Sequence, residues 1–588
     1  MTTSTFSATY ILNLYRRGIA MFTINRWMAV AFMGLGCVLG HAASGGLNAS
    51  SPGKAPALNL NQSIGTNGNA TEKTLGGSGA IGDCAIVAAT QQAEKPANPT
   101  PERPNILVIM ADDVGWMNIS CYGGDILGTR TPNIDRIARE GIRFTSFYAQ
   151  PSCTAGRAAF ITGQLPVRTG LTTVGTPGSP AGLKEDPTLA QILKTKGYAT
   201  AQFGKNHLGD REEHLPHRHG FDEFWGNLYH LNGNEDLEDP DRPKNPEFRK
   251  KYDPRGIVSG TANGPTKDEG PLTSKRMETF DDEIVTKSLD FLDRRASDKK
   301  PFFLWHCPSR MHVFLHLKEE SRGKSRAGIE DVYGDALREH DNHVGQLLKK
   351  LDETGLDKNT IVIWTTDNGA YQYMWPQGGT TPFRGDKGTT WEGGVRVPTV
   401  VRWPGAPGGR VSGEIVSSLD LLPTLAAAAG EPDVVAKLRK GTEYGDTKYK
   451  VCLDGYDQTA LLSGKSEEST RNHVFYYDET VLTAIRYKQF KVTFSTKFGG
   501  NWDDPLQVLG RPQITNRLMD PFERQWGDVN RQLAERKTWV LTPILETTLG
   551  HLATFKEFPV RQVGLSAQVG KTIDGIQTQI LKLQHHDK

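Results

Sequence analysis

Cysteine is scarce in this chain, with six residues among 588. So few cysteines exclude a small fold held together mainly by disulfide bonds. The chain also has no long block of basic residues and no long segment in which basic and aromatic residues alternate. Its formal net charge is only +2. A nucleic-acid partner is therefore not expected. Nor is a stable membrane span, because the apolar run near the amino end is well short of the ~20 residues that a helix needs to cross a bilayer.

The amino end has the order of residues that is typical of a secretory signal. Arginines, the last of them Arg26, precede an apolar run from Trp27 to Leu39, and small residues follow. This order predicts a signal peptide over residues 1–43, with Met21 as an alternative start and an uncleaved membrane anchor as the alternative reading. We therefore expect export, to a periplasm or to the medium.

Residues 44–103 are rich in Gly, Ala, Asn, Ser and Thr and show no sustained hydrophobic period. This composition predicts a flexible linker between the signal and the folded part of the chain.

Short, continuous apolar runs begin after this linker. Asn105–Met110 and Thr360–Thr365 are typical of strands that are covered on both faces. Residues 198–203 form a further strand candidate, and helix-like patterns fall between the runs. The expected helices cover residues 133–140, 189–196, 280–294 and 332–353. Strands that alternate with helices predict an α/β fold with a large, mostly parallel central sheet flanked by helices.

The pattern changes beyond about residue 450. His473–Tyr477 and Leu482–Phe494 are expected to form adjacent antiparallel strands, and the tail from Thr538 has a helical pattern. The sequence thus predicts a smaller C-terminal subdomain with a short antiparallel sheet. This region either covers a cleft of the main domain or mediates self-association, and the sequence favours neither.

Two of the predicted strands end on polar residues. Asp112 and Asp113 follow the first strand, and Asp367 and Asn368 follow the strand at 360–365. The carboxyl ends of strands in open α/β sheets form the ligand crevice. Oxygen-only ligands suit a hard cation, so these four residues predict a site for calcium or magnesium rather than for zinc or copper.

The segment Cys153-Thr154-Ala155-Gly156-Arg157 places a cysteine at a loop-to-helix junction with an arginine four residues later, on the same helical face. A half-buried thiol at a helix start is the plain structural reading. The segment resembles the cysteine-x-proline-x-arginine signature of the sulfatase family, with Ala155 where the family usually has proline. The resemblance implies that a maturation enzyme oxidises Cys153 to formylglycine, whose hydrate is the nucleophile.

Further motifs resemble the family in the same order along the chain. The resemblance nominates Lys205 and His207 from Gly-Lys-Asn-His, and Lys387 from a second lysine motif. It nominates His312 as the acid for the leaving group, with His316 as the alternative. In extended backbone, Lys205 and His207 would project to the same side. The family's metal site implies one divalent ion, expected to be calcium with magnesium as the alternative, held by Asp112, Asp113, Asp367, Asn368 and the oxygen derived from Cys153.

The charges of these residues point to an anionic substrate. Three carboxylates around one dication leave a net charge of minus one, so cations are needed to attract an anionic ester. With Arg157, Lys205 and Lys387 added, the site becomes positive and selects sulfate or phosphate esters.

The resemblance implies a formylglycine-dependent sulfatase with an alkaline-phosphatase-like fold, whose catalytic domain covers residues 104–450 and whose C-terminal subdomain covers 451–588. The expected substrate is a small-molecule or glycan sulfate ester. One alternative is a phosphate- or phosphonate-monoester hydrolase on the same scaffold. The other is a non-catalytic secreted protein that binds sulfated glycans.

Overall fold

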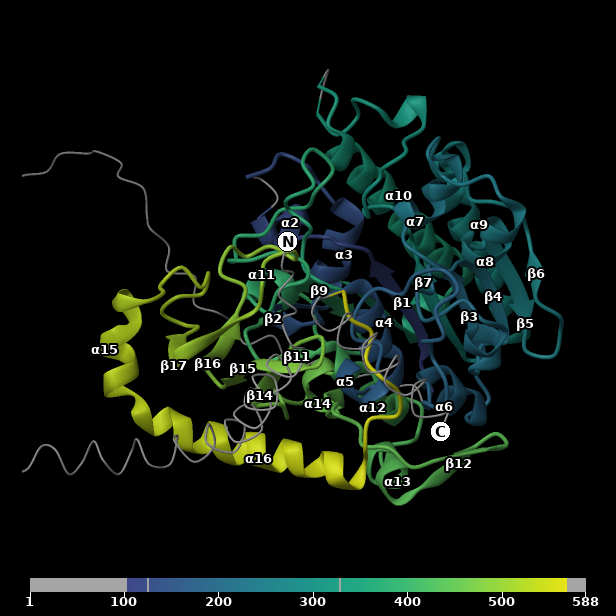
Figure 1. Cartoon of the computed structure of the whole chain (residues 1–588). Helices are drawn as coiled ribbons and strands as arrows, with labels where there is room; N and C mark the ends of the chain where they lie inside the picture. Colours follow the sequence, from purple (N-terminus) through teal and green to yellow (C-terminus); the bar gives the residue numbers. More distant parts are fainter. Residues whose placement is uncertain (1–102, 124–125, 327–328, 568–588) are drawn as a thin grey trace, which may run out of the picture. The chain divides into compact units, whose positions relative to one another are not determined.

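The computed structural model describes residues 103–123, 126–326 and 329–567 (Figure 1). The predicted signal peptide lies outside the described residues, and so does the predicted linker except for Arg103.

An eleven-stranded sheet forms the centre of the described chain, in the order β10-β2-β9-β8-β1-β7-β3-β4-β5-β6, with β11 also paired to β2. The neighbours β8, β1, β7, β3 and β4 run parallel, whereas β9 and β5 are antiparallel to their partners. This arrangement confirms the predicted mostly parallel sheet. The strands are β1 (Asn105–Ala111), β2 (Ile142–Tyr148), β3 (Ala199–Gly204), β4 (Glu223–Asn227), β5 (Ile257–Thr261), β6 (Lys267–Asp268), β7 (Phe302–Cys307), β8 (Thr360–Thr366), β9 (Arg396–Arg402), β10 (Arg410–Ser412) and β11 (Val416–Ser417).

Strand β1 shows why the apolar runs are continuous. Ile106, Val108 and Met110 belong to the hydrophobic core on one face of the sheet, and the alternate residues Leu107 and Ile109 belong to the core on the other. Successive side chains of a strand point to opposite faces, so a strand covered on both faces needs apolar residues at every position.

Helices cover both faces of this sheet (Figure 1). One core includes residues of α4 (Cys153–Thr162), α6 (Leu189–Thr195) and α12 (Leu421–Ala428). The other includes residues of α3 (Pro132–Glu140), α9 (Ser274–Asp298) and α10 (Val332–Thr354), so all four predicted helices are confirmed, α9 being longer than expected. The shorter helices are α2 (Ser120–Gly123), α5 (Pro166–Thr169), α7 (Leu231–Glu235), α8 (Pro246–Tyr252), α11 (Glu392–Val395), α13 (Val434–Lys440) and α14 (Thr459–Leu462).

A second, four-stranded antiparallel sheet follows, in the order β14-β15-β16-β17. The single strand predicted over 482–494 is wrong, because the chain reverses at Lys488, whose φ of 50° belongs to a tight turn. Strand β17 and helix α15 were not predicted from the sequence. The elements are β14 (His473–Asp478), β15 (Val481–Tyr487), β16 (Phe490–Thr496), β17 (Gln507–Asn516) and α15 (Asp528–Arg536), and a two-stranded ribbon, β12 (Thr442–Tyr444) with β13 (Thr447–Tyr449), precedes them.

The predicted helical tail is only partly right. Helix α16 (Leu541–Glu557) packs on the second sheet, where its Ile544 joins the core formed by Ile485 and Val492 (Figure 1). The chain then continues without helix through Pro559 to Ala567. Among the described residues, no helix combines the length and the apolar character that crossing a membrane requires.

Candidate active site

The two predicted acidic pairs meet at one edge of the central sheet. Strands β1 and β8 are parallel neighbours whose last residues, Ala111 and Thr366, are register partners. Asp112 and Asp113 therefore emerge beside Asp367 and Asn368, and the Asp113 amide donates a hydrogen bond to Asp367 Oδ1 at 3.4 Å. All four side chains are buried. The four residues therefore lie together at this edge, and their role as metal ligands stays a prediction.

Helix α4 brings Cys153 and Arg157 to this edge, and Gly156 makes the close approach feasible. A Cβ atom at Gly156 would lie 1.9 Å from the carbonyl oxygen of Asp367, which no side chain tolerates. Arg157, one residue later, donates from Nε to Asp367 Oδ2 at 2.9 Å and from Nη1 to the Lys205 carbonyl at 3.1 Å.

Lys205 and His207 follow β3 and reach the same place, but not along extended backbone as predicted. Gly204 has φ of 102° and His207 has φ of 59°, because the Asn206 amide turns to bond the carbonyl of Asn227 on the neighbouring strand β4. The Lys205 ammonium pairs with Asp112. Neither ring nitrogen of the buried His207 has a hydrogen-bond partner among the described residues.

Lys387 and His312 join the same cluster of buried side chains, next to Asp113. Lys387 Nζ lies 2.6 Å from Asp113 Oδ1 and 3.3 Å from His312 Nε2. His316 instead pairs with Glu235. The structure therefore brings His312, and not the alternative His316, into the cluster.

His230 also belongs to this group, although no motif in the sequence predicted it. Its ring stacks on that of His312, with centroids 5.4 Å apart and an angle of 10°, and meets the ring of His207 at 5.6 Å. The Gly233 amide donates to its Nδ1 at 2.9 Å, which fixes the ring at the start of α7. Its position three residues after β4, at the carboxyl edge of the sheet, is the signal that could have identified it.

Burial dominates the electrostatics of Cys153. It raises the pKa of this fully buried thiol, although the nearby Lys205 and Lys387 both act to lower it. Burial alone would also raise the pKa of Asp112, but Lys205 and other nearby cations hold it well below its usual value. The pKa of Asp367 rises to about 7 through burial and the charge of Asp112.

The residues present fit a hard divalent cation. Asp112 Oδ1 and Asn368 Oδ1 are buried oxygens without a hydrogen-bond partner among the described residues. Candidate ligand atoms of Asp112, Asp113 and His312 lie within 4.8 Å of one another. Buried, unpartnered oxygens carry a large desolvation cost that a bound cation removes.

The chain is similar in sequence to known sulfatases. The family model "Sulfatase" matches residues 104–431, more than half of the chain. The chain is 35% identical to N-acetylgalactosamine-6-sulfatase of Canis lupus familiaris over 424 residues, which are 70% of this chain and 75% of the relative. It is 36% identical to arylsulfatase A of Homo sapiens over 416 residues, 68% of this chain and 76% of the relative.

A solved structure shows the same fold over most of the chain. The PsFucS1 sulfatase from Pseudoalteromonas sp. superposes with a TM-score of 0.70 and 32% identity, covering 79% of this chain and 92% of that one. The family match, the identities and the shared fold together place this chain in the type I sulfatase family of sulfuric ester hydrolases.

Proposed function

We propose that the cluster around Cys153 is the active site at which this chain hydrolyses sulfate esters, with formylglycine at position 153 and one divalent cation, Ca²⁺ in preference to Mg²⁺. The products are sulfate and an alcohol or phenol. The observation that carries the proposal is the convergence of a buried cysteine with three carboxylates and three cations from five separate segments. These residues are Cys153, Asp112, Asp113, Asp367, Arg157, Lys205 and Lys387.

The formal charges of this group suit a sulfate ester. The three carboxylates balance the three cations, so one bound dication leaves the site with a charge of plus two, which attracts an anion. Asp112, Asp113, Asp367 and Asn368 would hold the cation, together with the oxygen at position 153. When bound, the cation supplies a positive charge that favours an ionised oxygen at that position.

Formylglycine at position 153, once hydrated, would supply one hydroxyl for the attack on sulfur and a second whose loss of a proton releases sulfate and restores the aldehyde. Lys205 and Lys387 hold the sulfate oxygens, where preorganised cations meet the charge that develops in the transition state. His312 donates a proton to the departing oxygen, and His207 accepts the proton of the second hydroxyl. Arg157 is fixed by Asp367 at 2.9 Å and presents its charge beside position 153.

Mass spectrometry of the peptide that contains position 153 tests the proposal. We expect an aldehyde in the place of the thiol. A quantitative thiol would contradict the catalytic proposal and favour the non-catalytic glycan-binding protein.

Paired aryl sulfate and aryl phosphate substrates separate sulfatase activity from the phosphate-monoester alternative. We expect kcat/KM to favour the sulfate, with activity lost on chelation and restored by calcium. Higher turnover of the phosphate would support the alternative instead.

We further propose the division of the chain that the sequence predicts. A signal peptide over residues 1–43 would direct export to a periplasm or the medium, and the linker 44–103 would precede the catalytic domain 104–450 and the C-terminal subdomain 451–588. The partners would be a formylglycine-generating maturation enzyme and a small-molecule or glycan sulfate ester.

A further inference from the structure

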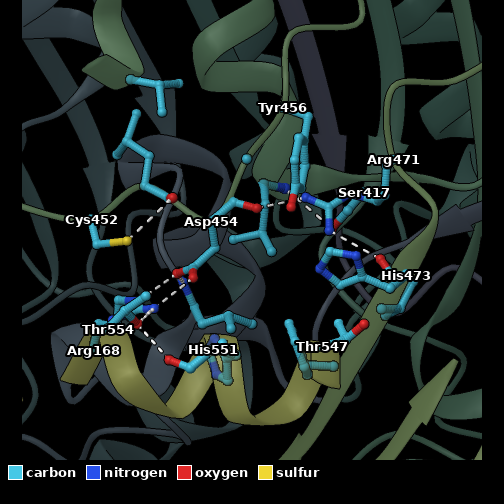
Figure 2. A pocket seen from close by; sticks show the side chains of 18 of the residues that line it. Arg168, Ser417, Cys452, Asp454, Tyr456, Arg471, His473, Thr547, His551 and Thr554 are labelled. Carbon is cyan, nitrogen blue, oxygen red and sulfur yellow. Dashed lines mark hydrogen bonds and ion pairs between the residues drawn. The ribbon is translucent and has the colours of Figure 1, made fainter. Parts of the chain in front are cut away.

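The part of the chain beyond the family match returns to the candidate active site at two places. The first begins at α16, whose Thr554 accepts a hydrogen bond from Arg168 Nη2 at 2.8 Å, while Asp454 pairs with the same arginine (Figure 2). Phe555 lies under the Arg168 guanidinium, 4.3 Å from the ring centroid. These contacts fix the end of α16 against the start of the loop after α5.

Residues 558–567, which we call the strap, continue from this anchor along that loop. The Leu565 amide donates to the Gly170 carbonyl at 3.0 Å, and its own carbonyl accepts from the Thr172 hydroxyl. Gln562 Nε2 donates to the carbonyls of Thr169 and, at 2.9 Å, Gly182. The strap therefore holds both ends of the loop 170–183.

The strap reaches the neighbourhood of the proposed catalytic residues. Leu565 lines a small cavity together with Thr154, which follows Cys153, and His207. The volume of this cavity is ≈ 10 Å³, about the space that one water molecule needs. Leu565 therefore borders a small cavity that His207 also lines.

The second place of return is the lysine motif. The ring of Trp502, in the connection between β16 and β17, has Lys387 Nζ 5.7 Å from its centroid. A Cβ at Gly388 would lie 2.3 Å from Trp502 Cγ, so the ring packs directly on this glycine. Lys497 Nζ donates to the carbonyls of both Gly388 and Trp502, at 2.9 and 2.8 Å.

We infer that the C-terminal region forms two walls of the active site, with Leu565 beside His207 and Trp502 beside Lys387. Because Lys387 Nζ lies 3.3 Å from Nε2 of His312, the proposed acid for the leaving group, Trp502 limits the size of the leaving group that the site accepts. The inference rests on the proposed function of the Cys153 cluster. Of the two roles that the sequence allowed for the C-terminal region, covering a cleft or mediating self-association, the inference selects the first.

The test compares Leu565→Ala and Trp502→Ala with the unaltered full chain, using 4-nitrophenyl sulfate and a sulfated disaccharide. Removing the Trp502 ring opens the site on the side of His312, so the ratio of kcat/KM values in Trp502→Ala is expected to shift about tenfold toward the disaccharide. Leu565→Ala, on the side of His207, is expected to keep the original ratio. Val563→Ala and Trp539→Ala are matched controls, because Val563 is 91% and Trp539 56% exposed, and both are expected to keep the original ratio. A ratio within about twofold of the original in Trp502→Ala, or an equal shift in Leu565→Ala, would overturn the inference.

A second measurement does not depend on catalysis. Gln562→Ala removes the hydrogen bonds to the carbonyls of Thr169, just before the loop 170–183, and of Gly182, near its end. Hydrogen exchange of the loop amides is therefore expected to become faster, with Val563→Ala unchanged. Unaltered exchange in Gln562→Ala would show that the strap does not hold the loop, and would also overturn the inference. If the unaltered enzyme hydrolyses neither substrate, the proposed function fails, and the exchange experiment still decides whether the strap holds the loop 170–183.

Discussion

Gly156 sets the distance between α4 and the end of β8. Its Cα faces the backbone of Asp367, where a Cβ would lie 1.9 Å from the carbonyl oxygen. Because backbone atoms cannot move aside as a flexible side chain can, a larger residue must push the helix and the strand apart. The separation of Cys153 from the acidic pairs therefore depends on the absence of one methyl group.

Gly156→Ala is expected to lower the free energy of unfolding by about 2 kcal/mol, the usual cost of overpacking a filled core, and to lower kcat as well. Urea unfolding and turnover of an aryl sulfate measure the two effects. Gly550→Ala is the control, since a Cβ there meets nothing within 4 Å and the position lies inside α16. It is expected to raise stability slightly. Equal stabilities for both variants would contradict the close-contact argument.

Lys387 is the cation whose removal tests the proposed holding of sulfate. Lys387→Ala is expected to lower kcat by about 10²-fold or more, because a preorganised charge is lost where the transition state needs it. Lys349→Ala is the control, with a side chain that is 75% exposed. Steady-state kinetics decide, and a kcat within about threefold of the original would remove Lys387 from the mechanism.

At the scale of elements, Glu392 on α11 joins the two sheets. Tyr148 of β2 and Tyr476 of β14 both donate to its carboxylate, at 2.8 and 2.9 Å. Lys491 and Arg517 lie 3.6 and 3.7 Å away, and Glu392 itself has no exposed surface. Burial alone would raise its pKa, but Arg517 and the other cations hold the pKa far below its usual value.

Glu392→Gln is expected to reduce the free energy of unfolding by about 3 kcal/mol, because Arg517 and Lys491 lose a buried counter-charge. Urea unfolding measures the loss. Glu443→Gln, at an exposed position of β12, is the matched control and is expected to change little. A small effect of Glu392→Gln would mean that Glu523, which lies 2.9 Å from Lys491, suffices as the counter-charge.

The elements also show why some sequence predictions succeeded. The runs at 105–110 and 360–365 are apolar at every position because both faces of β1 and β8 are covered, and this local pattern identifies them as central strands. The turn at Lys488 carries no glycine or proline, so the division into β15 and β16 left no local signal. The strap has no local sequence signal either, because its backbone forms hydrogen bonds with a loop almost 400 residues earlier in the chain.

At the scale of the whole molecule, the contact between α16, the second sheet and the catalytic part contains two histidines that stay neutral (Figure 2). Burial lowers the pKa of both His473 and His551 to about 4. In the unfolded chain a histidine has a pKa of about 6.5, so below that pH the unfolded state binds more protons than the folded one.

The stability that these histidines contribute is therefore present above about pH 6.5 and lost as the pH falls toward 4, by at most about 3 kcal/mol for each. Urea unfolding at about pH 7.5 and about pH 5 measures the loss. In the double variant His473→Gln and His551→Gln, the difference between the two pH values is expected to shrink. An unchanged difference would place the acid sensitivity elsewhere.

The sequence by itself determined the alternation of strands and helices, the acidic residues at two strand ends, and the cysteine and arginine at the start of α4. Each of these depends on neighbouring residues and on the pattern that a local element imposes. Only the tertiary structure decided that His312 enters the cluster instead of His316, that His230 joins it, and that Leu565 and Trp502 border it. These contacts join segments far apart in the chain, and their positions follow from the packing of the whole core, which no local pattern encodes.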